Sequence, residues 1–505
     1  MIIAKLPDII MRKTILSVLF MVALAAAAQV ERPKLIVGLV VDQMRWDYLY
    51  RFQDEYGEGG LKRLLREGHS FENTMINYVP TVTAIGHASI YTGSTPALHG
   101  ICGNNFFIDG KEVYCCGDST VRGVGSDSKK SQMSPHNLLA STIGDELKLA
   151  TNFRSRVFGV AIKDRAAILP AGHSADAAYW WDTTVGHFIS SSYYMDRLPE
   201  WVESFNKQNN TKPRFEIVSD NLGVTMTFRM AEALLENEQL GQRGQTDMLA
   251  VSISSTDAVG HQVGIDGPEI HSVYKQLDKD LAHFLDELDR VIGRGQYLLF
   301  LSADHGGAHN YNYLQNHRIP AAGMESWSML KPLNNHLKAV FSTDKDLFYG
   351  ENMARFYLNH ELTAALGLDE ERVKGEAAKW LKRDKRVLEV VDFDKAATTA
   401  LPKIICERIV NGRNADRAGD IICILKPQVV ITTDNPEFRG TSHGAWNPYD
   451  AHIPFVLMGW NVAHGQSSEQ VNITDIAPTI CSMLHIEMPN AAIGRPVYSL
   501  PCSPR

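Results

Sequence analysis

Long apolar runs, basic tracts and paired-cysteine motifs are scarce in this chain of 505 residues. Beyond residues 1–28 no stretch is long and apolar enough to cross a bilayer, so we expect no membrane anchor. The formal net charge is −8 and no basic tract is present, so we expect no nucleic-acid binding. The 44% hydrophobic and 21% charged residues are ordinary for a globular protein. The length suits one large α/β domain with insertions, or two to three domains.

Cysteine is also scarce, with seven residues in the whole chain, and their spacing fits no zinc knuckle. Because seven is odd, at least one thiol stays free or pairs with another chain. Cys406 and Cys423 flank ERIVNGRNADRAGDII, a segment typical of a hairpin with an Asn/Gly/Asp turn, so they are candidates to face each other across it. We expect these cysteines to be structural rather than catalytic.

The N-terminus carries the one extended apolar run. Arg12 and Lys13 precede an apolar stretch of about 15 residues that ends in small residues, which is the order of a secretory signal peptide. We therefore predict that residues 1–28 are a signal peptide cut after Ala28, with Met11 as an alternative start, and that residues 29–505 form the exported chain. No cysteine lies at the cut, so we expect no lipid anchor, and the predicted location is the periplasm or the medium.

Five near-continuous apolar runs rich in Val, Ile and Leu predict strands. They are KLIVGLVVDQ, RVFGVAIKDR, DMLAVSISSTD, QYLLFLSADHGG and HIPFVLMGW. Continuous rather than alternating runs indicate strands buried on both faces, as in a mostly parallel sheet. Helical patterns lie between them, for example GGLKRLLREG, DNLGVTMTFRMAEALLENEQ and HSVYKQLDKDLAHFLDELDRVI. The predicted class is therefore α/β, a mostly parallel central sheet covered by helices.

Acidic residues and histidines follow or flank these runs. In sheets of this kind ligands bind beyond the carboxyl ends of the strands, so residues there are candidates for a site. Neutral imidazole and carboxylate oxygen are zinc ligands, and six of them can hold two metal ions at roughly 4 Å, a geometry suited to in-line displacement. The candidate ligands are Asp42, Asp257, His261, Asp304, His305 and His443.

Seven motifs, in order, make the chain similar to the alkaline phosphatase superfamily. They are VVDQMRWDYL, PTVTAIGHASIYTG, HGICGN, TDAVGH, SADHGG, SHG and the tail VNITDIAPTICSMLHIEMPNAAIGRPV. The resemblance is to the branch with a threonine nucleophile, which contains the phosphate-irrepressible alkaline phosphatases of flavobacteria and the nucleotide pyrophosphatase/phosphodiesterases. It covers roughly residues 33–320 and 430–500 and implies an alkaline-phosphatase-like three-layer sandwich. We interpret the segment of about 322–430 as an inserted subdomain that caps the site.

The resemblance also selects a nucleophile within PTVTAIGHAS. It implies Thr83 and leaves Thr81 as a turn residue. The segment TAIGHASIYTG can start a helix at about Thr83, and the N-terminus of that helix would offer free N–H groups and a positive dipole end to a phosphate oxygen. A bound metal would lower the pKa of the hydroxyl, so no neighbouring base is needed.

The implied cofactor is zinc, two ions per chain, with Thr83 among the groups that contact metal. The ion that activates Thr83 would be held by a first metal set, Asp42, Asp304 and His305. The ion at the leaving oxygen, which later activates the hydrolytic water, would be held by a second metal set, Asp257, His261 and His443. By the same resemblance Asn104 would donate its amide to a phosphoryl oxygen, with Asn105 as the alternative if the register is off by one.

Lys163 and Arg165 decide between monoester and diester. They lie two apart after a predicted strand, so in an extended segment their side chains face the same way. A monoester dianion carries one more exposed charge than a diester, and an Arg fork with a Lys point charge can bind it. The resemblance places such a Lys-x-Arg in the monoesterases. We therefore predict an exported two-zinc phosphomonoesterase acting on small phosphate monoesters through a phosphothreonine, with a nucleotide pyrophosphatase/phosphodiesterase as the alternative and a monomer favoured.

Three other classes fit the sequence less well. A sulfatase needs Cys or Ser in a C/S-x-P-x-R context, which Cys102, Cys115 and Cys116 lack. A cofactor-independent phosphoglycerate mutase uses Ser with manganese and is cytosolic, which conflicts with the predicted signal peptide. A non-catalytic binding protein on a decayed enzyme fold would have lost at least one ligand, whereas all six are present together with Thr83.

Overall fold

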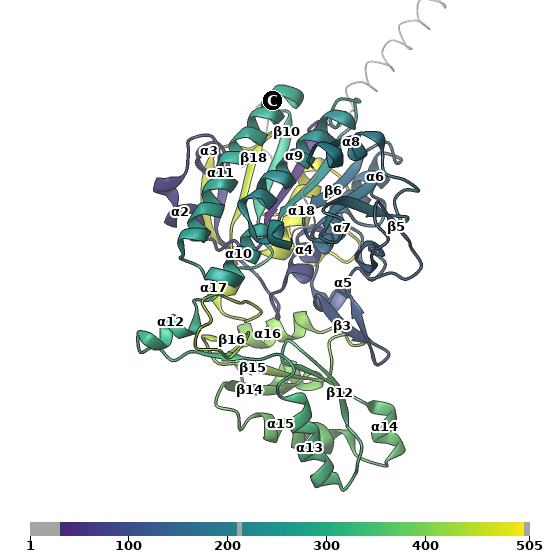
Figure 1. Ribbon diagram of the computed structural model, residues 1–505, viewed down its shortest axis with the longest axis vertical. Helices are drawn as coiled ribbons and strands as arrows, with labels where there is room; N and C mark the ends of the chain where they lie inside the picture. The colour runs from purple at the N-terminus through teal and green to yellow at the C-terminus, as the bar shows by residue number, and fades with distance from the viewer. Residues whose placement is uncertain (1–30, 210–214, 499–505) are drawn as a thin grey trace, which may run out of the picture.

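The main sheet determines where the predicted metal site lies. The structure is a computed structural model and describes residues 31–209 and 215–498, so the predicted signal peptide lies outside the described residues. Within these ranges the main sheet has eleven strands, shown in Figure 1. In spatial order they are β17 (His452–Ile453), β2 (His69–Met75), β18 (Phe455–Gly459), β10 (Tyr297–Ser302), β1 (Leu35–Val41), β9 (Asp247–Ile253), β6 (Val157–Ala161), β7 (Ala177–Asp182), β8 (His187–Ser191) and β5 (Gly123–Val124), with β19 (Gly465–Asn472) paired to β2.

The centre of the sheet is parallel, as the continuous apolar runs predict. β10, β1, β9, β6 and β7 are parallel neighbours in that order, and Leu35 lies opposite both Tyr297 and Asp247. Every residue of β1 is buried, which explains why its run does not alternate with polar residues. The fifth apolar run forms β17 and β18 instead, and β18 pairs antiparallel with β10.

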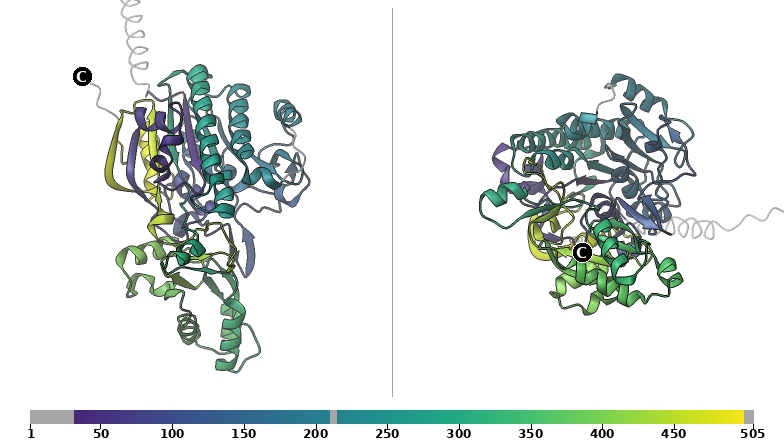
Figure 2. Two further views of the ribbon diagram at one scale, coloured as in Figure 1. Left: turned by 60° about the vertical axis from the view of Figure 1, so that its left-hand side comes forward. Right: turned by 60° about the horizontal axis from the view of Figure 1, so that its bottom comes forward.

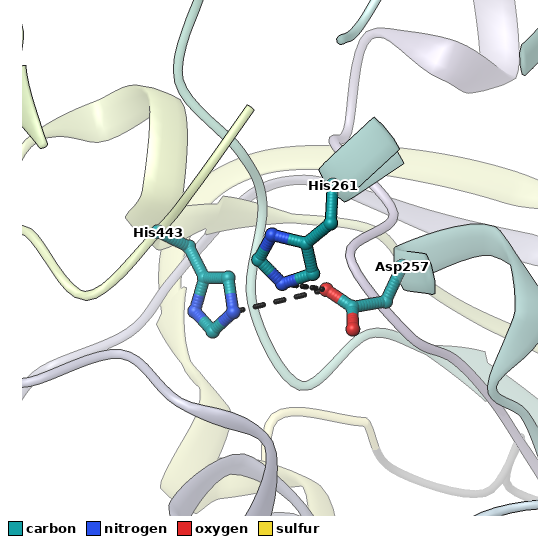
Figure 3. A group of neighbouring side chains, drawn as sticks. All are labelled: Asp257, His261 and His443. Atoms are coloured by element: carbon teal, nitrogen blue, oxygen red, sulfur yellow. Dashed lines mark ion pairs between the residues drawn. The ribbon is translucent and has the colours of Figure 1, made fainter. Parts of the chain in front are cut away.

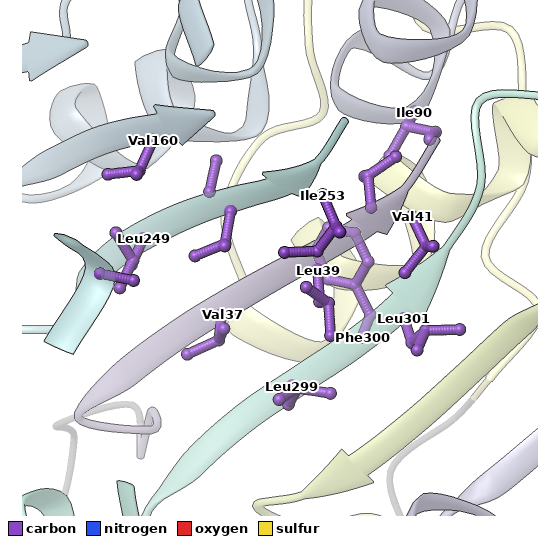
Figure 4. Packing of buried hydrophobic residues seen from close by; sticks show 14 of the residues in the cluster. Val37, Leu39, Val41, Ile90, Val160, Leu249, Ile253, Leu299, Phe300 and Leu301 are labelled. Atoms are coloured by element: carbon purple, nitrogen blue, oxygen red, sulfur yellow. The ribbon is translucent and has the colours of Figure 1, made fainter. Parts of the chain in front are cut away.

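Helices cover the sheet on both faces, which makes a three-layer α/β sandwich (Figures 1 and 2). One group contains α9 (Asn221–Asn237) and α11 (Pro268–Leu288), and the other contains α4 (Thr83–Thr92), α7 (Asp164–Ala171) and α18 (Ile476–Leu484). α9 and α7 both lie on β6 and β9, one from each group. Figure 4 shows Val37, Leu249 and Leu299 from three adjacent strands packed in the core that these layers enclose.

A second sheet lies below the main one in Figure 1. The chain leaves the main domain at β11 (Ala322–Met324) and returns to it at β16 (Val429–Ile431). These two strands pair in parallel. Between them β12 (Phe348–Asn352), β13 (Arg355–Leu358), β15 (Ile421–Leu425) and β14 (Val387–Asp392) form a four-stranded antiparallel sheet. With α13 (Leu330–Phe341) and α15 (Glu370–Leu381) this sheet encloses its own apolar core. The segment predicted as an insertion, about 322–430, is this part of the chain.

The predicted hairpin between Cys406 and Cys423 is wrong. α16 (Lys403–Gly412) takes up the first half of that segment and β15 takes up the end of it. Ile405 and Ile409 are four residues apart and both buried, so the helical face outweighs the turn-forming residues beside it. The six cysteines of the described ranges are all free, so Cys406 and Cys423 form no disulfide.

Candidate metal centre

The first metal set forms where β1 and β10 end. Asp42 follows β1, and Asp304 and His305 follow β10. Because these strands are parallel neighbours, their carboxyl ends meet at one edge and bring the three side chains together. All three are fully buried. His305 Nε2 lies 3.4 Å from Asp42 Oδ1 and 3.6 Å from Asp304 Oδ2.

These three atoms fit a cation. Asp42 Oδ1, Asp304 Oδ2 and His305 Nε2 are buried without a hydrogen-bond partner among the described residues, and unpaired buried polar atoms are costly unless a ligand satisfies them. His305 Nδ1 lies 2.9 Å from the Gly306 carbonyl, which fixes the tautomer that leaves Nε2 with a free lone pair. Burial lowers the pKa of His305, so the ring is neutral, as a metal ligand must be.

Charge at this set also favours a cation. Burial, together with the negative charges of Asp257 and Asp304, raises the pKa of Asp42 well above its usual range. Lys163 offsets part of this charge, because its Nζ lies 2.5 Å from Asp42 Oδ2 and 2.6 Å from Asp257 Oδ2. Lys163 therefore pairs with two of the three carboxylates here, and a divalent ion would supply further positive charge.

The second metal set comes from a helix and a loop. Asp257 and His261 lie one turn apart in α10 (Ser255–Val263), which follows β9, and His443 lies in the loop before α17 (Pro448–Ala451). Asp257 Oδ1 is 3.1 Å from His261 Nε2 and 3.7 Å from His443 Nε2 (Figure 3). Both rings turn Nδ1 to a backbone carbonyl, of Thr441 and of Thr81, so both Nε2 atoms face Asp257.

The pKa values of the two histidines of this set shift in opposite directions. Burial lowers the pKa of His443 well below its usual value, so that ring is neutral. Burial also lowers the pKa of His261, but the adjacent Asp257 carboxylate outweighs it and raises the pKa overall. A metal ligand must be unprotonated, so the raised pKa of His261 makes metal binding at the second set dependent on pH.

The two sets form one centre. The rings of His305 and His443 stack with centroids 3.6 Å apart and planes 12° apart. All six predicted ligands are thus brought together, three in each set. A third acidic group in the described part of the chain, Glu371 with Asp392 and Asp394, is satisfied by Lys374 and is not part of this centre.

Thr83 lies at the start of α4, as predicted. It is the first residue of the helix, after the extended Val82, and is 1% exposed. The side chain of Asn104 joins it there, because Asn104 Oδ1 accepts the N–H of Ala84 at 3.0 Å. Asn105, the alternative, turns away and donates to Glu112. The helix start therefore brings together the predicted nucleophile, Thr83, and Asn104, the residue predicted to bind a phosphoryl oxygen.

The spacing argument for Lys163 and Arg165 is wrong in its geometry. Lys163 is extended, but α7 begins at Asp164, so the pair does not lie in one extended segment. Lys163 turns to the metal sets, whereas Arg165 Nη1 donates to the Tyr114 hydroxyl at 3.1 Å. That hydroxyl in turn donates to Asp164 Oδ1 at 2.6 Å. Tyr114, on strand β4 (Lys111–Tyr114), carries no motif of its own and was not predicted from the sequence.

Thr81 is more than a turn residue. Its carbonyl accepts from His443 Nδ1 at 2.7 Å, its hydroxyl donates to the Ala445 carbonyl at 3.1 Å, and the same hydroxyl accepts from Gly444 N–H at 3.1 Å. Thr81 therefore anchors the loop that carries His443. The sequence gives no direct sign of this role, because the partners are 362 residues apart.

A mostly parallel sheet that brings six candidate metal ligands and a threonine at a helix start to one edge is that of a metal-dependent hydrolase of the alkaline phosphatase type. The chain belongs to the type I phosphodiesterase/nucleotide pyrophosphatase family, whose sequence profile matches residues 36–446. Among residues 31–209 and 215–498 no helix is both long and apolar enough to span a membrane.

Several characterised proteins are similar along nearly their whole length. A protein of Myroides odoratus named calcium-transporting ATPase is 46% identical over 95% of this chain and 96% of its own. Alkaline phosphatase PafA of Elizabethkingia meningoseptica is 41% identical over 96% and 98%, and alkaline phosphatase PhoV of Synechococcus elongatus is 42% identical over 93% of each chain.

The crystal structure of PafA superimposes on this chain with a TM-score of 0.88 at 41% identity, covering 93% of this chain and 99% of the other. A solved PafA variant carries substitutions of one threonine, one asparagine, one lysine and one arginine. The separations of these residues match those of Thr83 from Asn104 and of Lys163 from Arg165 in this chain.

Proposed function

We propose that the chain is an exported phosphomonoesterase that holds two zinc ions, one at each metal set, and acts through a phosphothreonine at Thr83. The observation that carries the proposal is the buried, unpaired group of Asp42 Oδ1, Asp304 Oδ2 and His305 Nε2 beside the second set. The names of PafA and PhoV support phosphatase activity. The predicted signal peptide, residues 1–28, supports a periplasmic or secreted location.

In this proposal zinc would lower the pKa of the Thr83 hydroxyl and stabilise negative charge on the attacking and leaving oxygens. Asn104 donates its amide to one phosphoryl oxygen, and Lys163 with Arg165 binds the extra negative charge of a monoester. Thr83 Oγ loses its proton and bonds to phosphorus while the ester oxygen leaves and takes up a proton. Water then attacks the phosphothreonine, which releases inorganic phosphate and restores Thr83.

We also propose that the inserted segment of about 322–430 caps this site. The turn between β12 and β13 lies at Met353 and Ala354, both at positive φ, and reaches the loop of His443. A Cβ added at Gly444 would lie 2.2 Å from Met353 Cε, so this tip fits closely against the residue after His443. A cap beside the second set limits the size of the leaving group, which suits small phosphate monoesters.

A nucleotide pyrophosphatase/phosphodiesterase is the second candidate, because the matching family profile carries that description. The deciding experiment is metal analysis of the purified protein, with rates on a matched aryl phosphate monoester and diester. About two zinc ions per chain and a clear preference for the monoester would support the first proposal. A preference for the diester would favour the second. ATP should be included among the substrates that are tested, because the relative from Myroides odoratus is named an ATPase.

A further inference from the structure

Gln43 occupies an unusual position beside both metal sets. It follows Asp42 at the end of β1, is 4% exposed, and has φ of 62°. A non-glycine residue in this left-handed region is uncommon and needs surrounding contacts to hold it there. Gln43 is not one of the six ligands, and its contacts have not entered the proposed reaction.

Gln43 binds one carboxylate of each set. Its backbone N–H donates to Asp304 Oδ1 at 3.1 Å, in the first set. Its side-chain Nε2 donates to Asp257 Oδ1 at 2.6 Å, in the second set. An ionised carboxylate only accepts hydrogen bonds, so the NH₂ end of the amide has to face Asp257. The one residue therefore holds the first set with its backbone and the second set with its side chain.

Two glycines make room for this side chain. A Cβ added at Gly260, in α10, would lie 2.0 Å from Gln43 Oε1. A Cβ added at Gly307, after His305, would lie 3.3 Å from Gln43 Cγ, Cδ and Oε1. The amide is thus enclosed between the helix that carries Asp257 and the loop that follows the first set. This packing limits movement of the amide away from Asp257.

We propose that Gln43 is a positioning residue whose side chain fixes the Asp257 carboxylate for metal binding at the second set. The inference rests on the proposed two-metal centre. Groups that hydrogen-bond a ligand fix its orientation, and their removal typically weakens metal binding about 10- to 100-fold. Because the first set is held by the backbone N–H of residue 43, substitution of this side chain leaves that contact in place. The loss therefore falls on the second ion alone.

The test uses three substitutions of Gln43 and equilibrium zinc binding against a competing chelator. Gln43→Gly removes the side chain and suits φ of 62°, so it retains the local backbone. Gln43→Met retains most of the volume and removes the donor. Gln43→Glu retains the shape and places a second carboxylate against Asp257. Gln239→Gly is the matched control, because Gln239 is exposed, has φ of 50° and lies outside the metal centre.

Wild-type protein is measured first, and about two ions per chain are expected. In Gln43→Gly and Gln43→Met the ion at the first set should bind as in wild type, and the ion at the second set should bind about 10- to 100-fold more weakly. Gln43→Glu should weaken the second ion at least as much, and Gln239→Gly should weaken neither. Wild-type binding of both ions in the Gly and Met variants would overturn the role of Gln43, as would equal weakening of both ions. Fewer than two ions in wild type would instead refute the two-metal centre itself, and the inference with it.

Discussion

Replacing Arg165 with alanine is the cleanest test of the monoester assignment. Lys163 contacts Asp42 and Asp257, so its removal would also disturb two proposed metal ligands. Within the described residues no hydrogen bond joins the Arg165 side chain to either metal set. Its guanidinium is held through Nη1 by the Tyr114 hydroxyl, and Nε is buried without a partner. The remaining N–H groups are therefore free to bind a phosphoryl oxygen.

The size of the effect follows from one lost contact between charged groups. Such a hydrogen bond contributes roughly 1.5–3 kcal/mol, and each ~1.4 kcal/mol is a tenfold change in rate. Arg165→Ala should therefore lower kcat/KM for an aryl phosphate monoester on the order of 10- to 100-fold. A diester lacks the extra negative charge, so its rate should fall less. The preference for the monoester should shrink accordingly.

Both rates are measured with the same aryl leaving group, and zinc content is determined in each sample. Tyr114→Phe is the companion variant, because it deletes only the hydroxyl that accepts from Arg165 and donates to Asp164. It should shift the monoester preference in the same direction but by less than Arg165→Ala, because it loosens the guanidinium without removing it. Equal losses on monoester and diester would show that Arg165 supports the site as a whole, and the phosphodiesterase candidate would then be favoured.

Further outcomes are expected at three other residues. Thr83→Ala should lower monoesterase activity by orders of magnitude with zinc content unchanged. Mass spectrometry should detect a phosphothreonine in the wild type and none in this variant. A phosphorylated residue elsewhere would contradict the assignment. Chelation should abolish activity and zinc should restore it, and His443→Ala should reduce zinc from about two ions per chain towards one, so two retained ions would exclude His443 as a ligand. Burial raises the pKa of Asp450 from 3.8 to about 8, so the folded chain retains a proton that the unfolded chain has released between these values. The stability linked to this proton is complete below the lower value and is lost as pH rises to the upper one, by about 1.4 kcal/mol per pH unit. Asp450→Asn should remove that slope in urea unfolding, and an unchanged slope would place the ionisation elsewhere.

The residues that end strong strand patterns could be predicted from the sequence. β1, β9 and β10 are continuous apolar runs, and parallel pairing brings their carboxyl ends to one edge. Asp42, Asp257 and Asp304 therefore meet without any knowledge of side-chain geometry. His443 lies in a loop far from these strands in sequence, so its place in the centre was predicted because the residue follows the family pattern.

Contacts between distant segments could not be predicted in the same way. Gln43 lies within the motif VVDQMRWDYL, but the motif gives it no role, and Tyr114 lies in no quoted motif. The roles of both residues depend on partners that lie 50 or more residues away. The orientation of Arg165 was missed because α7 starts at Asp164, and a helix start overrides the alternation expected of an extended segment. The hairpin at Cys406 failed for a related reason, since the buried face of α16 outweighed its turn-forming residues.

The two metal sets also differ in how the fold assembles them. The first set sits at the ends of β1 and β10, which pair from Leu35 and Tyr297 to Val40 and Ser302, so sheet pairing brings its proposed ligands together. The second set needs the loop of His443, which Thr81 anchors through its carbonyl and its hydroxyl. Thr81 is two residues from Thr83, so the segment that presents the proposed nucleophile also positions His443, the proposed ligand on the leaving side. A shift of this short segment would therefore displace Thr83 directly and the loop of His443 through Thr81. This shared support keeps the proposed attacking and leaving sides in register, as an in-line displacement requires.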